Sequence, residues 1–232
     1  MTTMTPHPLD NPIWASLNSR HRTLARAAGA VVRYPPAFAP FAAVASADAD
    51  VTAAMASLVE SDESVYLLGP VPSLPESWRL TQLALLAQMI CPTRIDTVDG
   101  PEIIELSETH RVDVLALTAL VYPHYFRPRT MELGRYFGIY RDGRLAAMIG
   151  ERMGMDDHQE ISAVCTHPDY SGRGYARQLL AWLSGDNLER GQIPFLHVSQ
   201  DNQRAMRLYA QNGYHLRCEI PFWSLRRANG AG

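Results

Sequence analysis

The stretch ISAVCTHPDYSGRGYARQLLAWL, residues 161–183, passes from an apolar run of β-forming residues, through a turn, into the pattern of a helix. Gly172 and Gly174 stand where the turn meets the helix, with Arg173 between them. The first turn of a helix has unpaired backbone N–H groups and a partial positive charge, and glycines let an anion approach both closely. The stretch therefore indicates either a tight structural turn or a site for a negatively charged group.

Three nucleotide-binding patterns compete for this glycine turn. A Walker-type loop is excluded, because no Gly-Lys-Ser/Thr sequence follows the glycines. A dinucleotide fingerprint fits poorly, since Arg177 stands where a third small residue is needed and the turn comes too late in the chain for a doubly wound sheet. A cradle for the pyrophosphate of coenzyme A is the interpretation that remains beside the structural turn.

The composition is that of an ordinary globular protein of 232 residues, with 47% apolar residues and a formal net charge of −3. This charge argues against nucleic-acid binding, and the apolar run at residues 83–90 is shorter than the roughly 20 residues of a membrane-spanning helix. Cys91, Cys165 and Cys218 are widely spaced, as expected of free thiols, and no metal-ligand spacing occurs. We expect a cytoplasmic protein without metal, nucleic-acid partner or membrane association.

Strand and helix patterns alternate along the chain and predict an α/β fold. In the first part, strands are expected at residues 41–44 and 65–69, and a helix is expected at residues 78–90. Residues 91–101 form the expected boundary between an N-terminal α/β extension (1–100) and a main domain (101–232).

The pattern is clearer in the second part. Asp142-Gly143 can supply the positive-φ turn of a hairpin spanning residues 136–153. The strands expected besides this hairpin are 103–107, 159–165 and 194–198, and the helices expected are 110–122, the segment after Gly174, and 201–213. In the helix after Gly174, one apolar face is formed by Ala176, Leu179, Leu180 and Leu183.

Two segments of this part resemble motifs of the GNAT acyltransferase superfamily. Residues 171–176 (SGRGYA) resemble its (Q/R)-x-x-G-x-(G/A) motif, with Ser171 in place of Gln or Arg. Its later N-x-x-A-x-x-L-Y-x-x-x-G-F/Y motif is matched by Asn202, Ala205, Leu208, Tyr209, Gly213 and Tyr214. The resemblance covers roughly residues 103–225 and implies a mixed central β-sheet with splayed parallel strands between helices. The opening residues resemble a bacterial branch related to glycine N-acyltransferases, whose first half is a partial copy of the fold.

The resemblance implies acetyl-CoA (coenzyme A) as the cofactor and N-acetyl transfer as the reaction. The implied cofactor contacts are Val164, Cys165, Thr166, Ser171, Gly172, Arg173, Gly174, Tyr175, Ala176, Arg177, Asn202, Ala205 and Tyr209. Tyr209 takes the family's general-acid position. Glu160 is the first choice for the general base and Glu151 the second, with His167 and His197 as further candidates. The alternative function is a catalytically inactive CoA-binding regulatory module.

The acceptor is expected to contact the loop at residues 122–130 (YPHYFRPRT). Tyr125 and Phe126 are candidates for an apolar pocket, with Tyr122 beside them, and Arg127 and Arg129 could bind a carboxylate through paired hydrogen bonds. The sequence thus predicts a small-molecule amine or amino acid as acceptor, and a monomer or homodimer.

Overall fold

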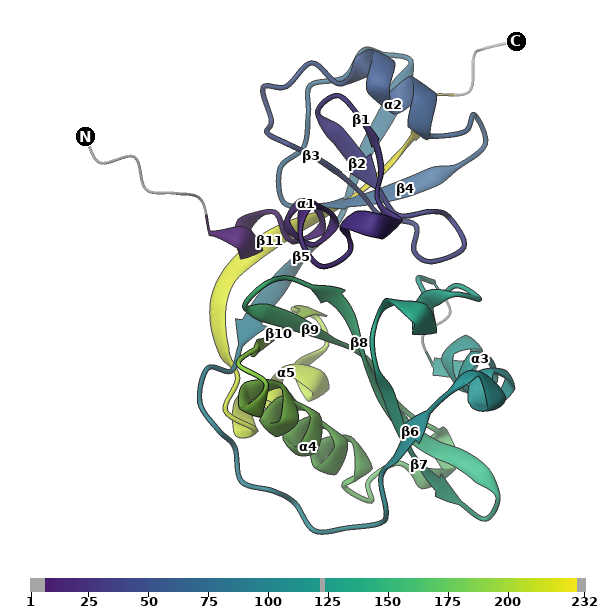
Figure 1. Ribbon diagram of the computed structural model, residues 1–232, viewed down its shortest axis with the longest axis vertical. Coiled ribbons are helices and arrows are strands. Elements are labelled where there is room, and N and C mark those ends of the chain that lie inside the picture. The colour runs from purple at the N-terminus through teal and green to yellow at the C-terminus, as the bar shows by residue number, and fades with distance from the viewer. Residues whose placement is uncertain (1–6, 122–123, 229–232) are drawn as a thin grey trace, which may run out of the picture.

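The computed structural model describes residues 7–121 and 124–228 of the chain. Among these residues, eight strands form one mixed sheet and three short strands form a second, as Figure 1 shows. Across the larger sheet the strands are β4 (Ser64–Leu68), β11 (His215–Arg227), β5 (Trp78–Ile90), β10 (Ile193–Ser199), β9 (His158–Thr166), β8 (Arg144–Gly154), β7 (Tyr136–Arg141) and β6 (Ile104–Leu106). The smaller sheet contains β1 (Arg26–Ala28), β2 (Val31–Arg33) and β3 (Ala42–Val44).

Two parallel strands in the middle of the larger sheet separate along their length. β10 pairs with β9 only as far as Phe195, which lies opposite Glu160. Beyond this point β10 continues to Ser199 beside β5, while β9 continues to Thr166 beside β8. We call the opening between them the fork. The predicted α/β fold with splayed parallel strands in a mixed sheet is confirmed.

Helices lie on both sides of this sheet. α4 (Tyr175–Glu189) and α5 (Gln203–Gln211) lie on one side, and α3 (Arg111–Val121) lies on the other (Figure 1). Leu179, Leu180 and Leu183 of α4 are fully buried in a core cluster that also contains Ile161 and Leu196 of the sheet. The apolar face predicted for this helix is therefore the face that packs on the sheet.

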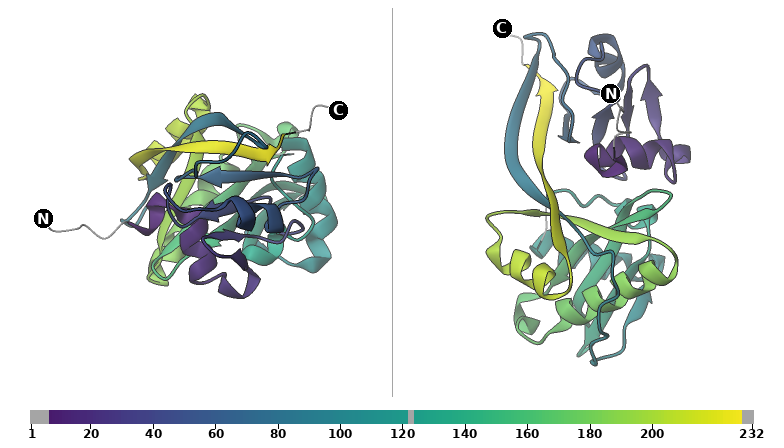
Figure 2. Two further views of the ribbon diagram at one scale, coloured as in Figure 1. Left: turned by 90° about the horizontal axis from the view of Figure 1, so that it is seen from above. Right: turned by 90° about the vertical axis from the view of Figure 1, so that its left-hand side faces the viewer.

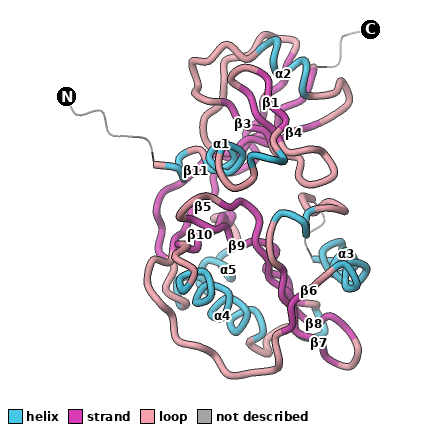
Figure 3. Tube along the Cα trace, in the orientation of Figure 1, coloured by secondary structure: helices cyan, strands magenta, loops and turns pink. Residues whose placement is uncertain are grey.

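An N-terminal lobe, made of α1 (Pro12–Asn18), α2 (Thr52–Leu58) and β1 to β4, lies above this part of the molecule in Figure 1. β5 and β11 run into the lobe as a long antiparallel pair, as the right-hand view of Figure 2 shows. The boundary predicted near residue 100 falls in the loop between β5 and β6, drawn in pink in Figure 3. The larger sheet takes strands from both sides of that loop, and the division into two domains stays a prediction.

The prediction of a helix at residues 78–90 is wrong. These residues form β5, which pairs with β11 and runs with it into the N-terminal lobe. The segment is rich in Leu, Ala and Gln, which favour helices. β5 pairs with β11 along its length and with β10 at its end, and this two-sided pairing outweighs the intrinsic preference.

The hairpin prediction is confirmed, since β7 and β8 are joined by Asp142 and Gly143 with φ of 51° and 72°. Short 3-10 segments complete the described secondary structure at Pro8–Asp10, Arg22–Leu24, Glu108–His110, Thr130–Leu133 and Pro168–Tyr170.

No helix in the described part of the chain is long and apolar enough to cross a membrane. Within residues 7–121 and 124–228, no group of three or more His, Cys, Asp or Glu side chains could hold a metal ion.

Candidate active site

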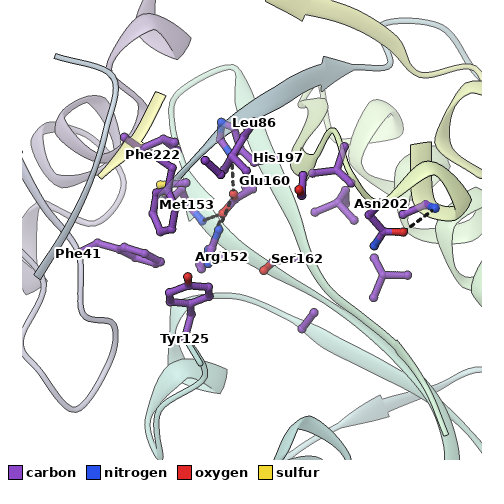
Figure 4. Close-up of a pocket in the computed structure, with 18 of the residues that line it drawn as sticks. Phe41, Leu86, Tyr125, Arg152, Met153, Glu160, Ser162, His197, Asn202 and Phe222 are labelled. Carbon is purple, nitrogen blue, oxygen red and sulfur yellow. Dashed lines mark hydrogen bonds and ion pairs between the residues drawn. The ribbon is translucent and has the colours of Figure 1, made fainter. Parts of the chain in front are cut away.

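A cavity of about 430 Å³ lies at the fork, with walls from β9, β10, α5 and the N-terminal lobe (Figure 4). Several predicted site residues line it together: Tyr125, Glu160, Val164, Cys165, Asn202, Ala205 and Tyr209. The other predicted cofactor residues lie outside the cavity lining, at the end of β9 (Thr166), in the glycine turn (Ser171, Gly172, Arg173, Gly174) and in the first turn of α4 (Tyr175, Ala176, Arg177).

A bulge interrupts β9 at the fork. Ala163 has a φ of 50°, which is uncommon for a residue with a side chain. The pairing of β9 with β8 shifts between Ser162 and Cys165. A bulge leaves one residue outside the regular hydrogen-bond ladder. Because Val164 lies in this irregular stretch and lines the cavity, its backbone N–H is a candidate donor to a ligand.

Glu160 lies where the fork closes, and only 1% of its surface is exposed. Arg152 donates to its carboxylate twice, at 2.7 Å from Nε and 2.8 Å from Nη2, and His197 Nδ1 lies 2.9 Å from Oε1. Burial alone would raise the pKa of this carboxyl, but the charge and hydrogen bonds of Arg152, with the hydrogen bond from His197, lower the pKa to about 2. A carboxylate with this pKa is a weak base.

The orientation of the Gln88 side chain determines which nitrogen of His197 carries the proton. Gln88 Oε1 accepts a hydrogen bond from Arg217 Nη1 at 2.7 Å, so the amide nitrogen faces the other way. That nitrogen lies 2.8 Å from the Leu9 carbonyl oxygen and 3.0 Å from His197 Nε2. An amide nitrogen can only donate. His197 Nε2 therefore accepts from Gln88, and Nδ1 carries the proton that it donates to Glu160.

Tyr209 reaches the cavity from α5. This helix begins after Asn202, whose Oδ1 accepts a hydrogen bond from the Ala205 N–H at 3.1 Å, and ends before Gly213 with a φ of 80°. The helix predicted at residues 201–213 is confirmed. Ala205 and Tyr209 are one helical turn apart, so both face the cavity. Tyr209 is 9% exposed, and its ring packs against the ring of Tyr214, 6.0 Å away between centroids.

The glycine turn connects β9 to α4. Gly172 and Gly174 have φ of 79° and 80°, the left-handed region that favours glycine. Gly174 is the N-cap residue, and no side chain caps the N-terminus of α4. A Cβ placed on either glycine would meet no atom within 4 Å, so the space before the helix is open. An open, uncapped helix N-terminus fits a phosphate group.

Arginines surround this turn. Arg173 lies over the Tyr170 ring at 5.1 Å from its centroid. Arg144 lies 6.0 Å from the same ring, and Arg141 Nε lies 3.4 Å from the Tyr175 hydroxyl. The sequence pattern does not indicate Arg141 and Arg144, because they come from the hairpin of β7 and β8 and reach the turn only through the order of the sheet.

The overall architecture matches solved structures. A protein from Novosphingobium aromaticivorans DSM 12444, described as an acetyltransferase of the GNAT family, is 36% identical to this chain, with a TM-score of 0.88 over 97% of this chain and 100% of that one. The chain belongs to the GNAT family. A family model described as FR47-like protein matches residues 136–223 of this GNAT chain.

More distant structures share the fold alone. A GCN5-related N-acetyltransferase from Kribbella flavida is 16% identical, with a TM-score of 0.63 over 94% of this chain and 95% of that chain. One from Sphaerobacter thermophilus is 14% identical, with a TM-score of 0.51 over 81% of this chain and 71% of that chain. None of the curated proteins matches the chain significantly.

The loop predicted to contact the acceptor is only partly at the cavity of this GNAT chain. Tyr125 lines it, but Phe126, Arg127 and Arg129 do not. Phe126 packs edge-on against Tyr136, at 5.8 Å between centroids. Arg129 donates two hydrogen bonds to Glu132, at 2.7 and 2.6 Å. Tyr122 lies outside the described residues. The predicted binding roles of Phe126, Arg127 and Arg129 stay predictions, and their side chains do not line the cavity.

Glu151 and His167, two further candidates for the base, lie outside the cavity lining. Glu151 is not in the cavity lining and binds Arg135, with Oε1 2.5 Å from Nη2. His167 Nδ1 accepts a hydrogen bond from the Asp169 N–H at 3.2 Å, outside the cavity. Burial raises the pKa of the Cys165 thiol to about 12, which does not suit a thiolate nucleophile. Besides Arg141 and Arg144, the sequence interpretation missed Arg152 and Gln88, although a charge inside an apolar strand could have indicated Arg152.

Proposed function

We propose that this GNAT chain transfers an acetyl group from acetyl-CoA to the amine of a small molecule or amino acid. The observation that carries this proposal is the fork. There, a bulged strand, Tyr209 and a cavity of about 430 Å³ meet, and the glycine turn after β9 leads to an open, uncapped helix N-terminus. The free thiols of the sequence further support a cytoplasmic location, and the likeness of the opening residues supports the glycine N-acyltransferase-like branch.

The chain offers two kinds of contact for coenzyme A. Residues 171–177 would hold the pyrophosphate on backbone N–H groups at the start of α4, and the arginines around the turn add positive charge. Val164, Cys165 and Thr166 would lie along the pantetheine arm, and Asn202 and Ala205 would flank it. The bound thioester supplies an activated acetyl group for attack by an amine.

Val164 and Tyr209 have distinct roles in this proposal. The Val164 backbone N–H stabilises negative charge on the carbonyl oxygen as the amine attacks. The Tyr209 hydroxyl donates a proton to the departing thiolate. A phenol with a pKa of about 10 giving its proton to a thiol of about 8.5 faces a cost of roughly 2 kcal/mol, which neighbouring positive charge can offset.

The cavity itself can favour the neutral amine. Moving an ammonium from water into apolar surroundings lowers its pKa, so the reactive form becomes more populated on binding. Glu160 is engaged by Arg152 and His197, and the Nε2 lone pair of His197 is engaged by Gln88. We therefore propose that Glu160 holds its partners Arg152 and His197 in position. Its role as the direct base stays a prediction, which the pH profile of kcat/KM can test.

The alternative is a CoA-binding regulatory module without catalysis. Purified protein incubated with acetyl-CoA and a panel of primary amines separates the two, when free thiol is followed with and without amine. Thiol release that requires the amine and matches the acetylated product supports the enzyme. CoA binding without transfer to any amine of the panel supports the regulatory module.

A further inference from the structure

One end of the cavity is lined by aromatic side chains. In Figure 4, Phe41, Tyr125 and Phe222 lie at one end and Asn202 at the other, with Arg152 and Glu160 between them. Asn202 begins the helix that carries Tyr209, so the thioester is expected at the Asn202 end of the cavity. The aromatic side chains lie at the opposite end. The remaining apolar lining near the lobe comes from Ile13, Leu68, Leu83, Ala84 and Leu86.

This aromatic end is already packed. Tyr125 and Phe222 meet edge-to-face at 5.5 Å and 83°, and Tyr66 stacks on Phe222 from behind at 5.5 Å. Phe41 lies 6.3 Å from Tyr125. These side chains therefore form an aromatic wall that their mutual packing holds in place, and Arg152 lies over the Phe41 ring at 4.8 Å from its centroid. Most of it belongs to the N-terminal half of the chain or to β11, which crosses into the N-terminal lobe.

The fixed charges of the cavity neutralise each other. Among the lining residues that the structure describes, Arg152 is the only arginine or lysine and Glu160 is the only acidic residue. The two form a bidentate pair. Arg127 and Arg129, the sequence candidates for a carboxylate site, lie outside the cavity lining, and Arg129 is paired with Glu132. A carboxylate on the acceptor would lose its hydration beside Glu160 without a cation of its own.

We propose that the acceptor is a primary amine carrying an aryl or branched alkyl group and no acidic group, with the apolar group against Phe41, Tyr125 and Phe222. This inference rests on the proposed function for the role of the amine, and it assigns the N-terminal lobe to acceptor selection. The amine would extend from the aromatic wall toward the bulge of β9, where the acetyl group is expected.

Three probe amines test the inference: 2-phenylethylamine, L-phenylalanine, which adds a carboxylate, and ethanolamine, which lacks the apolar group. Each is titrated calorimetrically into full-length protein saturated with CoA. We expect 2-phenylethylamine to bind at least about tenfold more tightly than the other two, because only it gains burial of the phenyl ring without desolvating a carboxylate. Equal or tighter binding of L-phenylalanine or ethanolamine overturns the inference.

A cavity-filling variant locates the binding site. Ala84 lies directly opposite Phe222 in the pairing of β5 with β11, so Ala84→Phe adds a ring beside the aromatic wall without removing a contact. This variant should weaken the binding of 2-phenylethylamine at least about tenfold. Leu216→Ala, a substitution at an exposed position elsewhere on β11, should leave the binding unchanged. Unchanged binding in Ala84→Phe, with its fold verified by circular dichroism, overturns the location.

Thiol release from acetyl-CoA, measured on the same samples, separates this inference from the proposed function. Absence of transfer to every amine, with the expected order of binding, removes the enzymatic function and leaves the pocket. Transfer to ethanolamine in preference to 2-phenylethylamine keeps the enzyme and removes the inference.

Discussion

At the scale of the single residue, the Tyr209 hydroxyl distinguishes catalysis from binding. Its proton is needed only when the thiolate departs, so Tyr209→Phe should lower kcat at least about tenfold and leave CoA affinity nearly unchanged. Tyr214→Phe is the matched control, because it removes a neighbouring hydroxyl that binds Ser184 at 2.7 Å and does not line the cavity. Steady-state kinetics and CoA titration of both variants check the prediction. A wild-type rate in Tyr209→Phe, with chemistry limiting, contradicts it.

The acceptor amine must lose a proton before it can attack, and either the cavity or a side chain of the protein can account for this loss. If the cavity selects the neutral amine, the acid limb of kcat/KM follows the pKa of the amine. Replacing an accepted amine by a less basic fluorinated analogue of the same shape should move this limb to lower pH by the difference between the two amine pKa values. A limb that stays at one pH for both amines would identify a protein group as the base, with Glu160 or His197 next to be substituted.

Single residues of the site could be predicted only where a local motif carried them. Asn202, Ala205 and Tyr209 share one helix, so their spacing alone places them on one face. Glu160 could be chosen as a candidate, but its partner Arg152 on β8 could not. Gln88, which donates to His197, could not be predicted either, because it lies on a strand that resembled a helix. The low pKa of Glu160 depends on Arg152 and His197 together and therefore could not be inferred from the sequence.

At the scale of the element, the N-terminus of α4 is the predicted phosphate site. Gly174→Val should abolish CoA binding in calorimetry, because the added side chain fills the open space before the helix. The variant also strains the backbone at a φ of 80°. Gly191→Val, at the other end of α4 with a φ of 74° and equally open surroundings, introduces similar strain away from the turn and should keep wild-type CoA affinity. Equal affinities in the two variants contradict the phosphate site.

The elements that could be predicted have their signals inside their own residues. The hairpin of β7 and β8 has Asp142-Gly143, and α5 has a cap and a terminating glycine. β5 has no such local signal: helix-favouring residues form a strand because β10 and β11 pair with it. Since these partners lie more than a hundred residues later in the chain, sequence pattern alone misses β5.

At the scale of the whole molecule, stability should depend on His21 in the N-terminal lobe. Burial lowers the pKa of His21 to about 4 from 6.5. As the pH falls, His21 therefore takes up a proton in the unfolded chain before it does so in the folded chain. The contribution of neutral His21 to the free energy of unfolding is complete above pH 6.5 and is lost between pH 6.5 and about 4. This group alone lowers the unfolding free energy by at most about 1.4 kcal/mol per pH unit.

Urea unfolding at several pH values measures this dependence. His21→Gln should flatten the slope between pH 6.5 and 4, while His215→Gln, an exposed position, should keep the wild-type slope. Because β5 and β11 join the lobe to the fork, we expect a single transition. The same slope in wild type and His21→Gln contradicts the assignment.

Acetyl transfer at the fork is most directly tested by a single-turnover experiment with acetyl-CoA labelled in both acetyl carbons. The enzyme is held in excess over the labelled acetyl-CoA, 2-phenylethylamine and a panel of other primary amines are supplied, and the products are identified by mass spectrometry. We predict that an acetylated amine carries both labelled carbons, and that the Ala84→Phe variant forms less of it from 2-phenylethylamine. Label that stays on CoA, or appears only as free acetate with every amine, would contradict acyl transfer by this chain.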